Sequence, residues 1–198
     1  MFFRLYATPL AAIIEEAAMV ATRLSIAEFE ATCGDARVEL VDGEVVPLSP
    51  SSFGSSNTSW MIGYLLGLYV VPRRLGSLSN AEAGFVIFPD RPTVLAPDVA
   101  FVRADRAPQG AARRHFANLA PDLVVEVNSP SDRPRDIASK VTMYQEAGVL
   151  LVWVVDPPAL TVTVHALGQQ PVTLGVDDEL DGGEVLPGFR VTVAEVFA

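Results

Sequence analysis

The stretch DLVVEVNSPSDRPRDIASKVTMYQEAGVLLVWVVD, residues 122–156, has the pattern strand, helix, strand. Its two ends are short, valine-rich apolar runs, which are typical of strands buried on both faces. The middle, residues 132–147, repeats apolar side chains at helical spacing and ends before a glycine. A helix that connects two buried strands predicts a parallel pair with a right-handed crossover. This stretch therefore predicts an α/β protein.

The flanking sequence adds helices and antiparallel strands. Upstream we expect a helix from Ser25 to Cys33 with Glu28 completing a capping box, and a hairpin turning at Asp42 and Gly43. We then expect a mostly apolar helix over 58–71, stopped by Pro72. Two strands follow, over 81–88 and 93–103, and the C-terminal part is predicted to form short strands. The fold class is thus mixed α/β: a mixed sheet flanked by helices, with an extra N-terminal hairpin and C-terminal strands.

Composition limits the classes of partner. The chain has 198 residues, half of them apolar, and 14 basic against 24 acidic residues give a net charge of −10. This charge disfavours non-specific binding of nucleic acid or anionic membranes by the whole surface. Residues 91–140 form the exception, with 8 basic and 6 acidic residues. They also contain Lys140, the only lysine beside 13 arginines.

The sequence also excludes an internal disulfide and gives no zinc motif. Cys33 is the sole cysteine, and His115 and His165 do not have the spacing of zinc ligands. No apolar run is long enough to span a bilayer, so we expect a cytoplasmic protein without a membrane partner. Residues 1–22 are interpreted as an N-terminal extension, with an amphipathic first helix as the alternative, and 23–198 as one domain.

Two carboxylates lie in apolar surroundings. Asp98 occurs within LAPDVAFV, and Glu126 occurs within DLVVEVN. Period-two alternation places Glu126 on the same face as Val124 and Asn128. A buried carboxylate is costly unless it is protonated, paired or bound to a metal. Two of them on neighbouring strands favour a site for Mg²⁺ or Mn²⁺, which prefer oxygen ligands.

Lys140 follows at the edge of the apolar stripe of the crossover helix. From there an ammonium could orient a water molecule or neutralise charge on a phosphorane-like transition state. Each residue also has a simpler explanation. Asp98 could cap a turn, Glu126 could pair with an arginine, and Lys140 could form an exposed helical pair with Asp136. The three residues together favour a metal-dependent site.

At these residues the chain resembles the Uma-two family of restriction-type endonucleases, a branch of the PD-(D/E)XK nuclease superfamily. The resemblance runs in family order from about Leu24 to the C-terminus. The matching segments are VELVDGEVVPLSP, AEAGFVIF, VLAPDVAFV, PDLVVEVNSPSDRPRD, K…Y…AGV, VWVVDP and LPGFRVTVAEVF.

The resemblance implies a restriction-endonuclease-like αβββαβ core and Mg²⁺-dependent hydrolysis of phosphodiester bonds in DNA. It assigns Asp98 to the PD element, Glu126 to the acidic position of (D/E)XK, and Lys140 to the family lysine on the following helix. The carbonyl of Val127 and the carboxylate of Glu82 are implied as further metal ligands. Glu39 is a weaker candidate, with an exposed strand carboxylate as the alternative.

The sequence departs from the family pattern in two places. Asn128 stands where the superfamily has its lysine, and SSFGSSNTSW lacks a histidine that family members often carry there. The leading hypothesis is a metal-dependent DNA endonuclease. The alternatives are a catalytically weak or inactive nuclease-like binding or regulatory module and a hydrolase of smaller phosphodiesters. A homodimer is possible, because two-fold symmetry suits the cutting of two strands.

Overall fold

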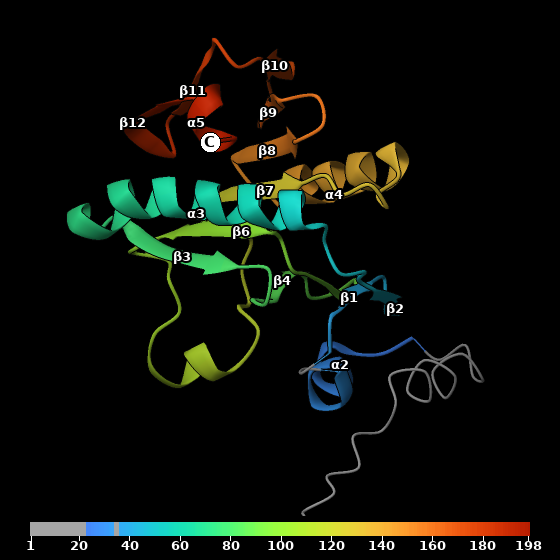
Figure 1. Cartoon of the computed structure of the whole chain (residues 1–198). Helices are drawn as coiled ribbons and strands as arrows, with labels where there is room; N and C mark the ends of the chain where they lie inside the picture. Colours follow the sequence, from blue (N-terminus) through green and yellow to red (C-terminus); the bar gives the residue numbers. More distant parts are fainter. Residues whose placement is uncertain (1–22, 34–35) are drawn as a thin grey trace, which may run out of the picture.

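The stretch that decides the fold forms the centre of a six-stranded mixed sheet (Figure 1). The computed structural model describes residues 23–33 and 36–198. Strands β7 (Leu123–Val127) and β8 (Leu151–Asp156) pair in parallel, and α4 (Pro134–Glu146) connects them. The predicted strand-helix-strand unit and the mixed sheet are therefore confirmed.

The rest of this sheet is antiparallel. Its order is β10-β9-β8-β7-β6-β3, with β6 at Val99–Arg103 and β3 at Gly76–Asn80 on one side. On the other side lie β9 (Thr161–Ala166) and β10 (Val172–Leu174). Strand β3 is not predicted by its sequence, because the residues GSLSN have neither apolar alternation nor β-branched side chains. They form a strand because they pair with β6 along its whole length.

A second sheet has four strands in the order β2-β1-β5-β4. The predicted hairpin is formed by β1 (Val38–Val41) and β2 (Glu44–Pro47). Its turn residues Asp42 and Gly43 both have positive φ, at 52° and 82°, as a type I′ turn requires. The sheet is completed by β4 (Phe85–Phe88) and β5 (Thr93–Leu95).

The prediction of one continuous strand over 93–103 is wrong. The chain pairs as β5 in the four-stranded sheet, leaves it at Ala96 and Pro97, and enters the six-stranded sheet as β6. Pro97 has no N–H to donate, so a strand ladder is readily interrupted there. Asp98 consequently lies in the bend between two sheets and not inside a strand.

The helices begin and end close to the predicted positions. Helix α2 (Ile26–Cys33) has the predicted capping box at Ser25. Helix α3 (Phe53–Arg73) starts earlier than predicted because Ser52 caps it, and Pro72 lies in its last turn instead of stopping it. The C-terminal part adds β11 (Glu179–Gly182), β12 (Leu186–Thr192) and the short α5 (Val193–Val196); a 3₁₀ helix, η1, covers Gly110–Arg114.

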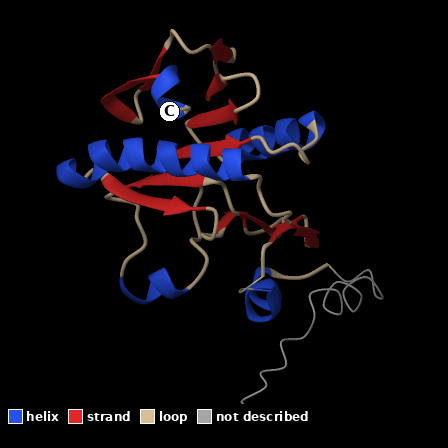
Figure 2. Cartoon of the chain, in the orientation of Figure 1, coloured by secondary structure: helices blue, strands red, loops and turns tan. Residues whose placement is uncertain are grey.

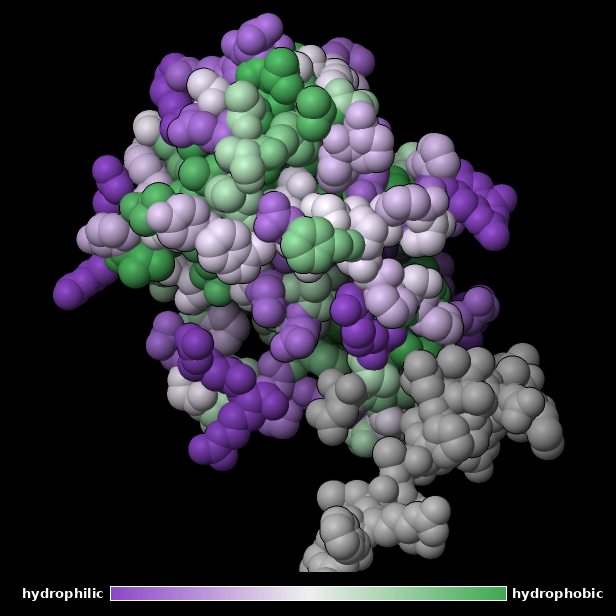
Figure 3. All heavy atoms as spheres, in the orientation of Figure 1, coloured by the Kyte–Doolittle hydropathy of each residue, from purple (hydrophilic) through white to green (hydrophobic). Residues whose placement is uncertain are grey.

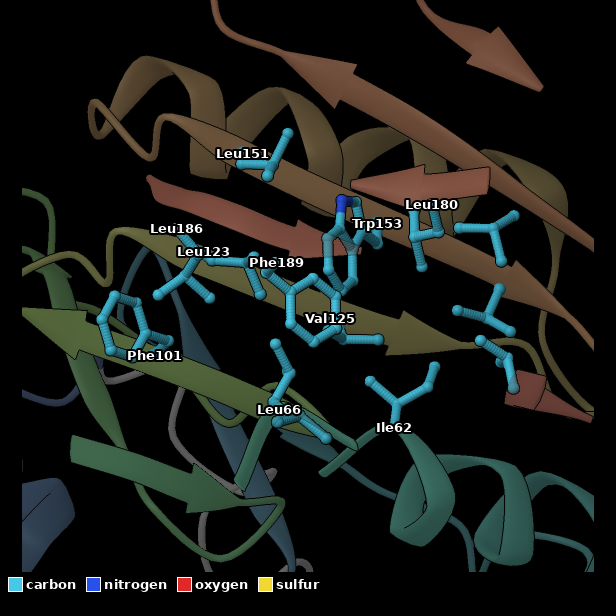
Figure 4. Close-up of a cluster of buried hydrophobic side chains, with 14 of the residues drawn as sticks. Ile62, Leu66, Phe101, Leu123, Val125, Leu151, Trp153, Leu180, Leu186 and Phe189 are labelled. Atoms are coloured by element: carbon cyan, nitrogen blue, oxygen red, sulfur yellow. The ribbon is translucent and has the colours of Figure 1, made fainter. Parts of the chain in front are cut away.

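Helices lie on both faces of the six-stranded sheet (Figure 2), and each face has its own core. On one face, α3, α5 and the β11–β12 pair cover a core that includes Ile62, Leu66, Trp153 and Phe189 (Figure 4). On the other face, α4 and strands β4 and β5 of the four-stranded sheet cover a core around Val124, Val152 and Tyr144. The second face holds the candidate site.

Two predictions concern the ends of the chain and membranes. Within the described residues, no helix is both long enough and apolar enough to cross a bilayer. The predicted extension at 1–22 lies outside the described residues, and the division at residue 23 stays a prediction.

Candidate functional site

One candidate carboxylate, Glu126, lies on β7, and the other, Asp98, lies in the bend just before the neighbouring strand β6. Glu126 is 5% exposed and faces α4 together with Val124, as the alternation predicts. Asp98 directly precedes β6, which pairs antiparallel with β7 so that Val99 is opposite Val125. The Oδ2 atom of Asp98 accepts a hydrogen bond from the Val127 N–H at 2.7 Å. Asp98 is therefore held against the same strand that carries Glu126.

Lys140 lies between two buried carboxylates. Its Nζ atom donates to Oε1 of Glu39 at 2.9 Å and is 3.6 Å from Oε1 of Glu126. Glu39 comes from β1 of the four-stranded sheet, whereas Glu126 comes from the six-stranded sheet. One turn of α4 thus places its ammonium where the two sheets converge.

Glu39 is part of this cluster. It is 2% exposed, and its Oε1 also accepts the Ala96 N–H at 3.0 Å. The interpretation of Glu39 as an exposed strand carboxylate is therefore wrong. The bond to Ala96 ties β1 to the segment that leads to Asp98, so the same oxygen fixes both the lysine and the bend.

Tyr144 is a further candidate site residue, which the sequence pattern does not single out. Its hydroxyl donates to Oε1 of Glu126 at 2.7 Å, and the residue is fully buried. It stands four positions after Lys140, so both side chains lie on one face of α4. That spacing was the available signal, because a tyrosine hydroxyl on the same helix face as a lysine at the edge of the apolar stripe can share its partner.

Burial and mutual charge set the protonation states. Burial raises the pKa of Glu126 to about 7, although the ammonium of Lys140 opposes the rise. Burial also raises the pKa of Asp98, against the hydrogen bond from Val127. Burial alone would lower the pKa of Lys140, but Glu126 and Glu39 outweigh it and keep that pKa above its ordinary value. Lys140 therefore stays charged at neutral pH.

The donor set suits a hard divalent cation. Three carboxyl groups, those of Glu39, Asp98 and Glu126, face one ammonium, which leaves negative charge to be compensated. Asn128, on the face of Glu126, has a buried Oδ1 with no hydrogen-bond partner among the described residues. Oxygen atoms of these types are the ligands of Mg²⁺ and Mn²⁺.

These oxygens do not form a preassembled cage of side chains. Within residues 23–33 and 36–198, no group of three or more His, Cys, Asp and Glu side chains is arranged to hold a metal ion. Mg²⁺ typically takes one or two carboxylates and keeps several waters. A site with two carboxylates and backbone oxygen is compatible with that preference.

Glu82 is not brought into contact with the cluster. It is exposed in the turn between β3 and β4, where its N–H bonds Oδ1 of Asn80. Glu82 instead lines two adjoining cavities, of about 360 and 490 Å³. Gly84 and Phe116 line both of them as well. The smaller cavity reaches Ala96, two residues before Asp98.

The larger cavity extends from Glu82 to a basic loop. Arg113 and Arg114, at the end of η1, line it and make no ion pair with any other residue that the structure describes. By contrast, Arg103 and Arg106 are both paired with the buried Asp122. Of the arginines in the 103–114 segment, only the two on η1 are thus available to an anion in the cavity.

Comparisons with known proteins identify one family and one shared fold. Residues 26–194 match the family model of Uma2, described as "Putative restriction endonuclease". Among solved structures, the chain is similar to "a putative nuclease belonging to DUF820 from Anabaena variabilis ATCC 29413". That match has a TM-score of 0.77 and 16% identity and covers 88% of this chain and 97% of the other. At this identity it shows the fold alone. The search of curated proteins found no match.

Proposed function

The chain belongs to the Uma2 family, and from this premise we propose that it is a metal-dependent endonuclease that hydrolyses phosphodiester bonds in DNA. The observation that carries the proposal is the position of Lys140. A charged lysine lies 2.9 and 3.6 Å from two buried carboxylates of different sheets, close to Asp98. A purely structural ion pair would leave no surplus of carboxylates, whereas this cluster has two.

The topology supports a restriction-endonuclease-like core. The six-stranded sheet and its two long helices have the order αβββαβ along the chain, formed by α3, β3, β6, β7, α4 and β8. The segment between β3 and β6 leaves that sheet as β4 and β5 and pairs with the N-terminal hairpin. The bend that returns the chain to the core carries Asp98.

In this proposal, Asp98, Glu126 and the carbonyl of Val127 hold Mg²⁺ or Mn²⁺, with the Oδ1 of Asn128 as an additional oxygen beside them. The bound ion supplies Lewis-acid activation of the phosphodiester and of a water. Glu82, at the junction of the two cavities, is proposed to contribute from the side on which substrate enters.

Lys140 acts through its charge. Because the carboxylates keep it protonated, it is suited to orient the attacking water and to stabilise the anionic transition state, and unsuited to accept a proton. Glu39 is a positioning residue, since its Oε1 holds Nζ of the lysine. Tyr144 orients Glu126 in the same way.

The larger cavity is proposed to take the DNA backbone beside the site, with Arg113 and Arg114 contacting phosphates. The smaller cavity is lined by Ala96, whose N–H bonds Glu39, but not by Asp98, Glu126 or Lys140. Glu30 also lines the larger cavity, but His115 and the Phe116 N–H pair with its Oε1. The cytoplasm, where DNA and Mg²⁺ are available, is the proposed location.

Cleavage of supercoiled plasmid and labelled oligonucleotides with Mg²⁺ or Mn²⁺ tests the proposal. We expect metal-dependent cleavage by the wild type and a loss of at least about a hundredfold in Asp98→Asn, Glu126→Gln and Lys140→Ala. Glu179→Gln, which removes an exposed carboxylate paired with Arg190, is the matched control and should leave cleavage unchanged.

Two outcomes would count against the nuclease. The first is no metal-dependent cleavage of any DNA form by folded wild-type protein. The second is cleavage that persists in Asp98→Asn. DNA binding without turnover, unchanged by Asp98→Asn, would instead support the alternative of an inactive binding or regulatory module.

A further inference from the structure

The outer face of α3 carries large apolar side chains in a continuous stripe. Their exposed fractions are 90% for Phe53, 63% for Trp60, 48% for Tyr64, 55% for Leu68 and 67% for Val71. At 100° per residue, all five fall within a sector of about 80° on the helix. Trp60 and Tyr64 stack on one another, with ring centroids 5.4 Å apart and planes at 4°. A stripe of this kind differs from scattered exposed residues and marks an interaction surface.

This face has no charge. From Phe53 to Pro72 the sequence contains no Asp, Glu, Lys, Arg or His, in a chain whose net charge is −10. Figure 3 views the molecule from the side on which α3 crosses the front of Figure 1. A polyanion would find no cation along the stripe. Two acidic copies of this chain, however, would meet with least repulsion at an uncharged face.

The stripe is large enough to form the centre of an interface. With about 200 Å² for a fully exposed aromatic side chain and somewhat less for Leu and Val, the exposed fractions amount to roughly 600 Å². A standard interface buries about 800 Å² on each partner, including its polar rim. The tryptophan and tyrosine at the middle of the stripe are also the residue types that contribute most to such interfaces.

The spacing of four of the five stripe residues is self-complementary. Position 62 is the midpoint between Phe53 and Val71 and also between Trp60 and Tyr64. A two-fold axis at position 62 that packs two α3 helices antiparallel would set Phe53 against Val71 of the second copy. It would likewise set Trp60 against Tyr64 of the second copy. Such reciprocity is the requirement for an isologous dimer.

We propose that the outer face of α3 is the interface of a homodimer in which two α3 helices pack antiparallel about a two-fold axis. The proposal does not depend on the proposed nuclease activity. The site lies on the other side of the helix: Ser55 Oγ bonds the Asn128 carbonyl at 2.9 Å, and Ser59 Oγ bonds the Asp98 carbonyl at 3.5 Å. Substitutions on the stripe therefore leave these contacts in place.

Sedimentation equilibrium of the full chain tests the interface. We expect the mass of two chains at micromolar concentration, and Trp60→Glu should raise the dimer dissociation constant by roughly thirtyfold or more. Val172→Glu is the matched control, because Val172 is 56% exposed on β10, away from α3. It should leave the dimer intact, and circular dichroism should show native folding for both variants.

Fluorescence supplies an independent measurement. Trp153 is buried in the core, so the concentration-dependent part of the emission comes from Trp60. Its emission should shift to shorter wavelength as the dimer forms. A mass of one chain at every concentration would overturn the proposal. The same result is expected if another segment of the same chain covers the stripe, so that case would overturn it too. A dimer that persists unchanged in folded Trp60→Glu would also overturn it.

Discussion

Replacing Lys140 with methionine would remove the ammonium that lies between Glu39 and Glu126 while keeping most of its side-chain volume. The Nζ atom is 2.9 Å from one carboxylate and 3.6 Å from the other, and both carboxylates are almost fully buried. Without the lysine, Glu39 keeps its bond from Ala96 and Glu126 keeps its bond from Tyr144. Neither carboxylate then has a positive partner among these contacts.

Removing one partner of a buried ion pair typically costs about 3–5 kcal/mol, because the remaining charge stays desolvated. For a chain of this size, about 1 kcal/mol corresponds to roughly 2–4 °C in melting temperature. We therefore expect Lys140→Met to lower the melting temperature by about 10 °C at neutral pH. Thermal unfolding followed by circular dichroism would measure it.

Arg91→Met is the matched control. Arg91 also bridges two carboxylates, Asp42 and Glu146, each at 3.2 Å, but all three side chains are about half exposed. Exposed ion pairs contribute about 0–1 kcal/mol. The control should therefore melt within a few degrees of the wild type.

Proton and metal should both relieve the penalty in Lys140→Met. Because the folded-state pKa of Glu126 is raised, the folded protein binds the proton more tightly, and stability is lost as pH rises through that range. The variant should thus approach the wild type near pH 5 and fall furthest behind near pH 8. Mn²⁺ at about a hundredfold above its dissociation constant should return about 2.7 kcal/mol.

Equal melting losses in Lys140→Met and Arg91→Met would refute the buried ion-pair reasoning. A loss in Lys140→Met that is independent of both pH and Mn²⁺ would also refute it, because the cost would then come from packing and not from uncompensated charge.

Three further predictions concern the surroundings of the site. Tyr144→Phe should weaken Mn²⁺ binding by about tenfold in calorimetry, because Glu126 loses the hydroxyl that orients it. The affinity of the wild type for Mn²⁺ should rise with pH by up to about tenfold per pH unit. It should level off above about pH 7, where Glu126 has lost its proton. An affinity that does not change with pH would contradict this. Asp122→Asn should cost about 2–4 kcal/mol in urea unfolding, because Asp122 is fully buried and pairs with Arg103 and Arg106, yet leave Mn²⁺ binding unchanged.

Local pattern was sufficient for the elements whose periodicity is strong. The hairpin at Asp42 and the capping box at Ser25 follow from neighbouring residues alone, because turns and caps are short-range properties. The parallel β7–β8 pair follows from the strand-helix-strand order, because a connecting helix brings the second strand back in the same direction. The segment 93–103 shows the limit. Its strand propensity is continuous, but which sheet each half joins depends on partners far away in the chain.

The sequence by itself brought Asp98, Glu126 and Lys140 to attention, because charges in apolar runs and a solitary lysine are visible without coordinates. Only the tertiary structure decided which partners their side chains have. The contact between Lys140 and Glu39 joins residues 101 positions apart, and the role of Tyr144 depends on a strand that α4 packs against. Such contacts form where two sheets and a helix exclude water, and the resulting burial sets the pKa of Glu126 and keeps Lys140 charged.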